Sequence, residues 1–203
     1  MAQKLHYFNI NGLAESIRYI LYYSGQKFED VRYERKDWPI KEVKERLPYG
    51  QLPFYEEGNR TLNQSLAIAR YVASKSDLLP SDPWDQAVLD AAVLNVYDFF
   101  NNARPWFKEE DPDKKEAIKK TFLGETVDFH LSRFEKELKK NNGYFGKKLS
   151  WADFVLVAII EVINLLFDAE IEKNYPTIKA LVQKVRNLPG VKEYIAKRPT
   201  YQF

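Results

Sequence analysis

The stretch Thr61-Leu62-Asn63-Gln64-Ser65-Leu66-Ala67-Ile68-Ala69-Arg70-Tyr71 decides the fold, together with Gln51-Leu52-Pro53 before it. It predicts a short strand that runs directly into an amphipathic helix. Ser65 then lies at the helix N-terminus, where unpaired backbone N–H groups and the helix dipole attract a carboxylate. The bond before Pro53, especially if cis, exposes the backbone of Leu52 for strand-like pairing with an extended peptide. The pattern predicts a docking site for a small acidic peptide, with Tyr7 within reach of its reactive atom.

The sequence around this stretch alternates strand and helix signals. Residues 5–8 and 28–33 predict strands, and the helical spacing between them ends at Gly25, a residue common at helix C-termini. Residues 53–56 and 60–63 predict a hairpin around Glu57-Gly58-Asn59. The order β-α-β followed by β-β-α favours a mixed sheet with helices packed on it.

The chain changes character after residue 75. Ser76 to Pro83, with two prolines, is the predicted linker between a domain of residues 1–75 and one of residues 84–203. Strand signals disappear beyond it, and helical patterns cover 84–107, loosened at Arg104-Pro105, then 114–140, 150–168, 175–188 and 191–197. Ser150 and Asp153 have capping-box spacing, which we interpret as a folding device and not as a site.

The composition indicates a cytosolic globular protein and excludes several kinds of chemistry. The 203 residues carry a net charge of +2, so no nucleic-acid partner is implied. They contain no Cys and two His, which argues against disulfides, a cysteine nucleophile and a metal cluster. The N-terminus lacks the apolar core of a signal peptide. The longest apolar run, residues 154–167, is too short to span a membrane and fits a buried helix.

The motifs and their spacing resemble the cytosolic glutathione transferases, and the sigma class in particular, over nearly the whole chain. The matching segments are Tyr7-Phe8-Asn9, Ala14-Glu15-Ser16-Ile17-Arg18-Tyr19-Ile20, Asp37-Trp38-Pro39, Leu47-Pro48-Tyr49-Gly50-Gln51-Leu52-Pro53, Gln64 to Tyr71, Leu149 to Phe154 and Lys197-Arg198-Pro199. The resemblance implies a thioredoxin-like N-terminal domain, β-α-β-α-β-β-α, and an all-α C-terminal domain. It also implies glutathione as co-substrate, no metal, a homodimer and a cytoplasmic detoxification enzyme.

The resemblance assigns the catalytic role to Tyr7. From the residues alone, a strand tyrosine that closes the core is the alternative. A phenol with a pKa of about 10 is protonated at neutral pH, and its hydrogen bond to a thiolate lowers the thiol pKa from about 8.5. Leu52 would pair its backbone with the cysteinyl unit, next to a cis Pro53. Gln64 and Ser65 would hold the γ-glutamyl end.

The resemblance also assigns the glycyl end of glutathione and a residue from a second subunit. Trp38, Lys44 and Gln51 match the positions that bind the glycyl end. Lys41 competes with Lys44, because the segment 40–46 is about two residues longer than in typical relatives, and both lysines also fit a solvated charged segment. Asp98 matches an aspartate that reaches into the site of the partner subunit, and a helix-surface charge is its alternative.

The electrophile site is expected between the first strand and the first long helix. The candidate residues are Phe8, Leu13, Arg104, Trp106 and Phe107. Aromatic residues at helical spacing are equally typical of a core. Trp106 matches a tryptophan of the glutathione-dependent prostaglandin D synthases, which are relatives within the sigma class.

Two other functions compete with transfer of glutathione to apolar electrophiles. The first is isomerisation of prostaglandin H to D. The vertebrate enzymes carry an arginine in place of Leu13 and metal-cluster aspartates in place of Leu94 and Tyr97, which argues against this function. The second is a non-catalytic ligand-binding protein like the lens crystallins. These carry many methionines and an insertion, whereas this chain has one Met and no obvious insertion.

Overall fold

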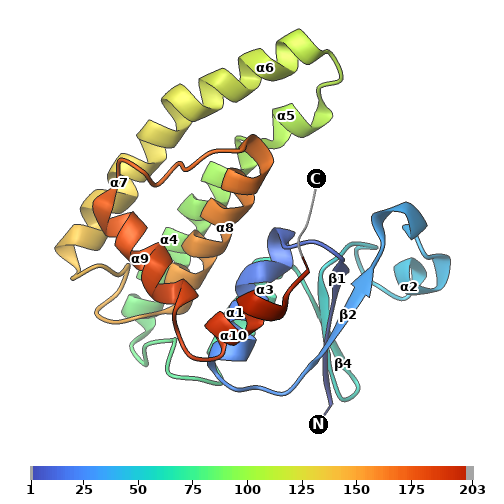
Figure 1. Ribbon diagram of the computed structural model, residues 1–203. Helices are drawn as coiled ribbons and strands as arrows, with labels where there is room; N and C mark the ends of the chain where they lie inside the picture. Colours follow the sequence, from blue (N-terminus) through green and yellow to red (C-terminus); the bar gives the residue numbers. More distant parts are fainter. Residues whose placement is uncertain (1, 200–203) are drawn as a thin grey trace. The chain divides into compact units, whose positions relative to one another are not determined.

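The computed structural model describes residues 2–199, which form two compact units. Of these residues, the first unit holds 2–79 and 186–199, and the second holds Pro80–Val185. Figure 1 shows a sheet with helices in the first unit and helices alone in the second. The predicted order β-α-β-α-β-β-α followed by helices is confirmed.

The first unit is built on a four-stranded mixed sheet. Its strands are β1 (Gln3–Phe8), β2 (Glu29–Tyr33), β3 (Phe54–Glu57) and β4 (Arg60–Asn63), in the order β2-β1-β3-β4. β1 and β2 are parallel, which requires the crossover through a helix. β1 is antiparallel to β3, and β3 to β4, as the Gly58-Asn59 turn predicts.

The helices of the first unit cover one face of this sheet. α1 (Glu15–Tyr23) and α3 (Ser65–Ala73) pack against each other, and α10 (Val191–Lys197) packs against α1. Leu5, Tyr7 and Tyr55 are buried, and Tyr55 lies against Tyr71 of α3. The alternation of a strand places His6 and Phe54 on the opposite face. α2 (Lys41–Glu45) belongs to the connection between β2 and β3 and has no buried residue.

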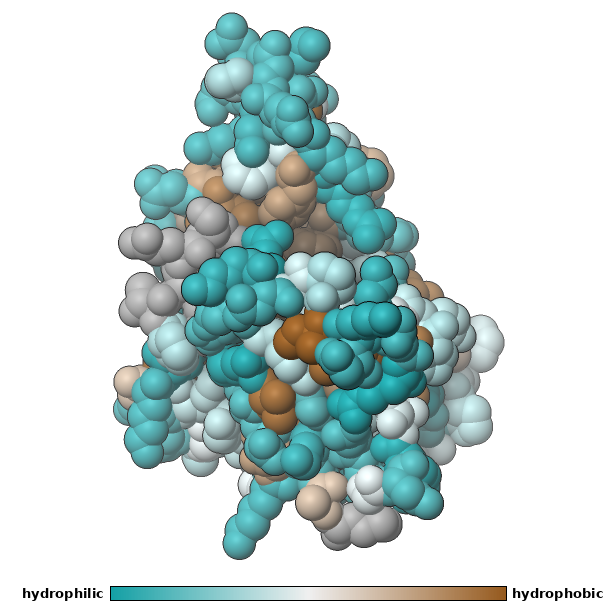
Figure 2. All heavy atoms as spheres, turned by 90° about the vertical axis from the view of Figure 1, so that its right-hand side faces the viewer, coloured by the Kyte–Doolittle hydropathy of each residue, from teal (hydrophilic) through white to brown (hydrophobic). Residues whose placement is uncertain are grey.

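The second unit is a helical bundle around α8 (Trp151–Phe167), which is buried along nearly its whole length and packs against α4 (Pro83–Asn101). The other helices are α5 (Arg104–Lys108), α6 (Pro112–Thr121), α7 (Val127–Lys140) and α9 (Pro176–Arg186). A π-helical turn, Phe122–Thr126, joins α6 to α7, so the pattern over 114–140 is one helical rod with a local widening. α6 has no buried residue, and the upper tip in Figure 2 is covered by hydrophilic side chains.

The predicted capping device of α8 is present. The carboxylate of Asp153 accepts hydrogen bonds from the backbone N–H and the hydroxyl of Ser150, at 2.7 and 2.9 Å, and from the N–H of Phe145 at 3.0 Å. Burial raises the pKa of Asp153 to about 6, although these hydrogen bonds favour the carboxylate.

One segment groups differently from the sequence-based division. Residues 186–199, which the sequence places in the domain 84–203, lie in the first unit, because α10 packs on α1. Gly190 permits this approach. A Cβ at this position would lie 2.3 Å from the carbonyl oxygen of Tyr22. Among residues 2–199, no helix is both long and apolar enough to span a membrane.

Candidate functional site

The register of the sheet brings the predicted glutathione-binding segments of the first unit to one edge. His6 pairs with Phe54, and Phe54 pairs with Asn63. Because β3 is antiparallel to its two neighbours, the residue after His6, the residue before Phe54 and the residue after Asn63 all lie at the same end of the sheet. These residues are Tyr7, Pro53 and Gln64, and the last leads directly into α3.

The two segments beside Tyr7 at this edge have the backbone features that the sequence predicts. The Leu52–Pro53 peptide bond is cis. Ser65 is the first residue of α3 and is buried, whereas the Gln64 side chain is exposed and its backbone has a φ of +73°. The nine-residue helix presents the backbone N–H groups of its first turn at the sheet edge. This arrangement suits a carboxylate.

Tyr7 is held by the turn that follows β1. Its side chain is buried, and its hydroxyl accepts a hydrogen bond from the backbone N–H of Leu13 at 3.2 Å. Gly12, at φ +48°, lies against the ring, and a Cβ there would come within 2.7 Å of the hydroxyl. Phe8 contacts the same ring, with the centroids 5.4 Å apart.

Arg18 of α1 holds this turn in place, a role that the sequence pattern did not predict. One guanidinium nitrogen donates to the carbonyl oxygens of Ile10 and Asn11 at 2.8 and 3.3 Å, and the guanidinium carbon lies 5.9 Å from the centre of the Tyr7 ring. The same nitrogen pairs with Glu15 at 3.1 Å, and both side chains have no exposed surface. The sequence signal that could have predicted this role is the charged pair Glu15 and Arg18, three residues apart on a largely apolar helix.

The charge of Arg18 is balanced from two directions. Nε pairs with Asp30 of β2, and Glu15 accepts hydrogen bonds from Tyr194 of α10 and from Arg198. Burial alone would lower the pKa of Arg18, but the carboxylates of Glu15 and Asp30 outweigh it and raise the pKa. Removing one charged side chain from such a buried network lowers the free energy of unfolding by about 3–5 kcal/mol.

The three residues predicted for the glycyl end of glutathione lie on the connection between β2 and β3. The Trp38 ring meets Phe8 edge-on, with centroids 5.8 Å apart. The stem of Lys44 lies over Gly50, where a Cβ would come within 3.2 Å of Lys44 Cγ, and the next residue, Gln51, is exposed. Lys41 is exposed and lies 4.0 Å from Glu45. The stem of Lys44 thus lies beside the predicted glutathione loop.

The predicted residues of the second unit lie on α4 and α5. Asp98 is an exposed residue of α4. Arg104 begins α5 and is exposed, and Phe107 is 43% exposed. Trp106 is half-buried, meets Phe167 of α8 with centroids 5.1 Å apart, and has the Lys115 ammonium 4.3 Å from its ring centre.

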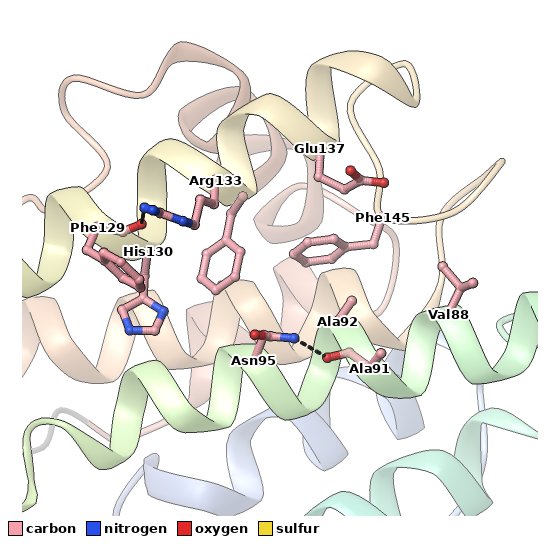
Figure 3. A pocket seen from close by; sticks show the side chains of 10 residues that line it. Val88, Ala91, Ala92, Asn95, Phe129, His130, Arg133, Glu137 and Phe145 are labelled. Carbon is pink, nitrogen blue, oxygen red and sulfur yellow. Dashed lines mark hydrogen bonds between the residues drawn. The ribbon is translucent and has the colours of Figure 1, made fainter.

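A groove of about 420 Å³ runs between α4 and α7 (Figure 3). Phe129, 55% exposed, lies at its rim with the Arg133 guanidinium 3.7 Å from its ring centre. His130 contacts the ring of Phe129. Burial and the charge of Arg133 lower the pKa of His130, and the nearby carboxylate of Asp98 opposes them in part. Ten residues line the groove: Val88, Ala91, Ala92, Asn95, Phe129, His130, Arg133, Phe134, Glu137 and Phe145.

Comparison with known proteins identifies the family. Residues 3–74 match the glutathione S-transferase N-terminal domain, and residues 97–198 match the C-terminal domain. A glutathione S-transferase of Anopheles gambiae is 35% identical over 97% of this chain and 96% of its own. The chain belongs to the glutathione S-transferase family and is an enzyme of the transferase class.

Two solved structures bear on the details. The prostaglandin synthase D of Nilaparvata lugens is 40% identical and superimposes with a TM-score of 0.92 over 99% of this chain and 100% of its own. A glutathione S-transferase of Necator americanus, described as monomeric, is 33% identical, with a TM-score of 0.88 over 100% of both chains. Relatives of this similarity therefore include a protein named as a synthase and one described as a monomer.

Proposed function

We propose that this protein joins the thiolate of glutathione to small apolar electrophiles, with Tyr7 as the catalytic residue. The observation that carries the proposal is that Tyr7, Pro53 and Gln64 lie at one end of the sheet, beside the N-terminus of α3. A hydroxyl donor, an open strand backbone and an anion-binding helix end are the groups that a γ-glutamyl peptide with a thiol requires.

The proposed chemistry depends on the hydroxyl of Tyr7. Its proton is donated to the glutathione sulfur, which favours the thiolate over the thiol. The N–H of Leu13 donates to the oxygen of the same hydroxyl, and this polarises the O–H as a donor. Arg18 keeps the turn of Leu13 in place and adds a positive charge near the ring. The thiol proton passes to solvent water, the thiolate sulfur forms a bond to the electrophilic carbon, and the leaving group, a halide in an aryl halide, departs with the electrons of the bond that breaks.

The remaining contacts to glutathione are assigned along its length. Leu52 pairs its backbone with the cysteinyl unit beside Pro53. Gln64 and Ser65 bind the γ-glutamyl end at the N-terminus of α3. Trp38, Lys44 and Gln51 bind the glycyl end. The position of the Lys44 stem over Gly50 supports Lys44 over Lys41. The candidate residues for binding the electrophile stay Phe8 and Leu13 on the first unit and, taken separately, Arg104, Trp106 and Phe107 on the second.

The proposal is tested by binding and by turnover. We expect the protein to be retained on immobilised glutathione, to be eluted by free glutathione, and to conjugate a chromogenic aryl halide. Retention without turnover would support a binding protein on this scaffold instead. Lack of both would remove the proposal.

Isomerisation of prostaglandin H to D is a second candidate. The likeness to the synthase of Nilaparvata lugens favours it. Leu13, Leu94 and Tyr97 replace the charged residues of the vertebrate synthases and oppose it. The two candidates are separated by supplying prostaglandin H and glutathione. Formation of the D isomer in preference to spontaneous products supports the isomerase.

We also propose that the protein acts as a sigma-class homodimer in the cytoplasm. Asp98 lies close to His130 of the open groove between α4 and α7, and Tyr49 of the first unit is 67% exposed, so both units offer surface for self-association. In this arrangement Asp98 of each subunit completes the glutathione site of the other. The Necator relative described as monomeric is the opposite precedent, so sedimentation of this protein is the direct test.

A further inference from the structure

A buried histidine on the sheet face opposite α1 and α3 holds a chain of hydrogen bonds that the proposed chemistry does not use. His6 is 4% exposed, and its ring stacks on Phe54 with the centroids 4.0 Å apart. Nδ1 lies 2.9 Å from the hydroxyl of Tyr33, and Nε2 lies 2.9 Å from one carboxylate oxygen of Glu56. The other oxygen of Glu56 is 3.3 Å from the guanidinium of Arg46.

The chemistry of the four groups fixes the direction of this chain. A carboxylate only accepts hydrogen bonds, so Nε2 of neutral His6 carries its proton toward Glu56, and Nδ1 accepts the proton of the Tyr33 hydroxyl. Burial lowers the pKa of His6 in spite of Glu56, and the charges of Arg46 and Lys4 act in the same direction as burial. The neutral ring that this chain requires is therefore the form present at pH 7. Each of the four side chains has a partner in it.

The surface segment between Tyr33 and Arg46 is joined to this imidazole at both ends, directly through Tyr33 and indirectly through Arg46 and Glu56. Tyr33 is the last residue of β2, and Arg46 directly follows α2. Residues 34–45 therefore form a loop between two members of this chain of hydrogen bonds. Neither the short turn at 35–37 nor α2 has a buried residue. A five-residue helix without a buried face has little stability of its own. The position of the loop therefore depends on its anchors.

We propose that His6 is a positioning residue, whose bonds to Tyr33 and Glu56 hold the segment 34–46 where Trp38 and Lys44 meet the glycyl end of glutathione. This inference rests on the proposed function. His6 acts through the segment and not on the reacting atoms. Its loss therefore weakens recognition of the glycyl end and leaves the γ-glutamyl half and the chemistry at Tyr7 unaffected.

γ-Glutamylcysteine, which is glutathione without its glycine, separates these effects. Two variants break the chain of hydrogen bonds. His6→Phe keeps an aromatic ring on Phe54, and Arg46→Met puts an apolar side chain in place of one whose guanidinium carbon lies 5.2 Å from the centre of the same ring. Lys4→Met is the matched control for the loss of a positive charge near His6, because Lys4 also lowers the pKa of His6 but pairs with Glu29, outside the segment. Calorimetry gives the affinity of each protein for both peptides.

We expect both variants to bind glutathione about tenfold more weakly, which corresponds to about 1.4 kcal/mol, and γ-glutamylcysteine as the wild type does. The kcat at saturating glutathione should stay at the wild-type value, since the glycyl contacts are equal in the ground and transition states. Lys4→Met should leave both affinities unchanged.

Equal weakening for the two peptides would reduce His6 to a purely structural role and overturn the inference. Unchanged glutathione affinity in the folded variants would overturn it as well. If His6→Phe does not fold, Arg46→Met decides alone, since half of that side chain is exposed and its loss leaves the core intact. A wild-type protein that binds neither peptide would instead overturn the proposed function.

Discussion

The backbone N–H of Leu13 donates a hydrogen bond to the hydroxyl oxygen of Tyr7, with nitrogen and oxygen 3.2 Å apart. The contact exists because Gly12 lets the chain pass against the Tyr7 ring, and because Arg18 holds the carbonyl oxygens of the same turn. A backbone donor on the phenol oxygen strengthens the hydroxyl as a donor toward a sulfur. Fold and proposed chemistry are thus joined at one turn.

Replacement of Tyr7 by Phe removes the hydroxyl and little else. We expect Tyr7→Phe to fold, to keep its glutathione affinity and to lose most turnover, because a charge-assisted hydrogen bond to the thiolate contributes about 1.5–3 kcal/mol. The pH profile of activity should move to higher pH, since the bound thiol then ionises less readily. Steady-state kinetics across pH measures both effects, and an unchanged rate and profile would refute the role of Tyr7.

Replacement of Gln64 should separate binding from chemistry. Gln64→Ala removes a contact that we place on the γ-glutamyl end, equally in the ground and transition states, so glutathione affinity should fall while kcat at saturation changes little. Gln183→Ala, an exposed position on α9, is the matched control. Wild-type affinity of Gln64→Ala by calorimetry would mean that the γ-glutamyl end lies elsewhere.

The action of Asp98 in trans is tested with mixed dimers. We expect Asp98→Ala to lower glutathione affinity with little change in stability, because an exposed charge contributes little. A dimer of one Tyr7→Phe and one Asp98→Ala subunit then has both defects in one site and an intact second site. Such a dimer should recover about half of the wild-type activity in a two-fold symmetric assembly.

The mixed-dimer measurement is made at a glutathione concentration where the Asp98→Ala homodimer has almost no activity. If Asp98 acted within its own subunit, each site would carry one defect, and the activity would equal the low average of the two homodimers. A monomer in sedimentation would remove the proposal of a shared site altogether.

The raised pKa of Asp153 makes the free energy of unfolding depend on pH. Its folded-state pKa of about 6 lies above the ordinary value of 3.8, so the folded protein holds this proton more tightly than the unfolded chain does. The resulting stabilisation is complete below the unfolded pKa and is lost as the pH rises through about 6. It changes by at most about 1.4 kcal/mol per pH unit.

The variant Asp153→Asn cannot titrate at this position, so its difference in stability from the wild type measures the contribution of Asp153. Its single acceptor oxygen faces the three donors from Ser150 and Phe145, so we expect it to be less stable than the wild type by about 1–3 kcal/mol. Denaturant unfolding between pH 4 and 7 should show the difference between the two proteins shrinking as the pH rises. A difference that stays constant over this range would contradict the assignment.

The sequence by itself determined the strands, the longer helices and their order. Alternation and helical spacing are local properties, so they predicted the strands, the hairpin at Gly58, the helix that begins at Ser65 and the capping of α8 by Asp153. The order and spacing of the motifs over nearly the whole chain also predicted the family, which the comparisons confirm. The contacts proposed for glutathione and the electrophile remain predictions.

Only the tertiary structure decided which distant residues meet. Arg198 reaches Glu15 across 183 positions, and His6 joins Tyr33 to Glu56 on two different strands. Such pairs cannot be predicted from a local sequence pattern. They form when distant segments pack together and bury charged and polar groups, which then require partners. For this reason the sequence indicated Tyr7 as the residue of interest, while the packing of the first unit revealed the side chains that hold it in place.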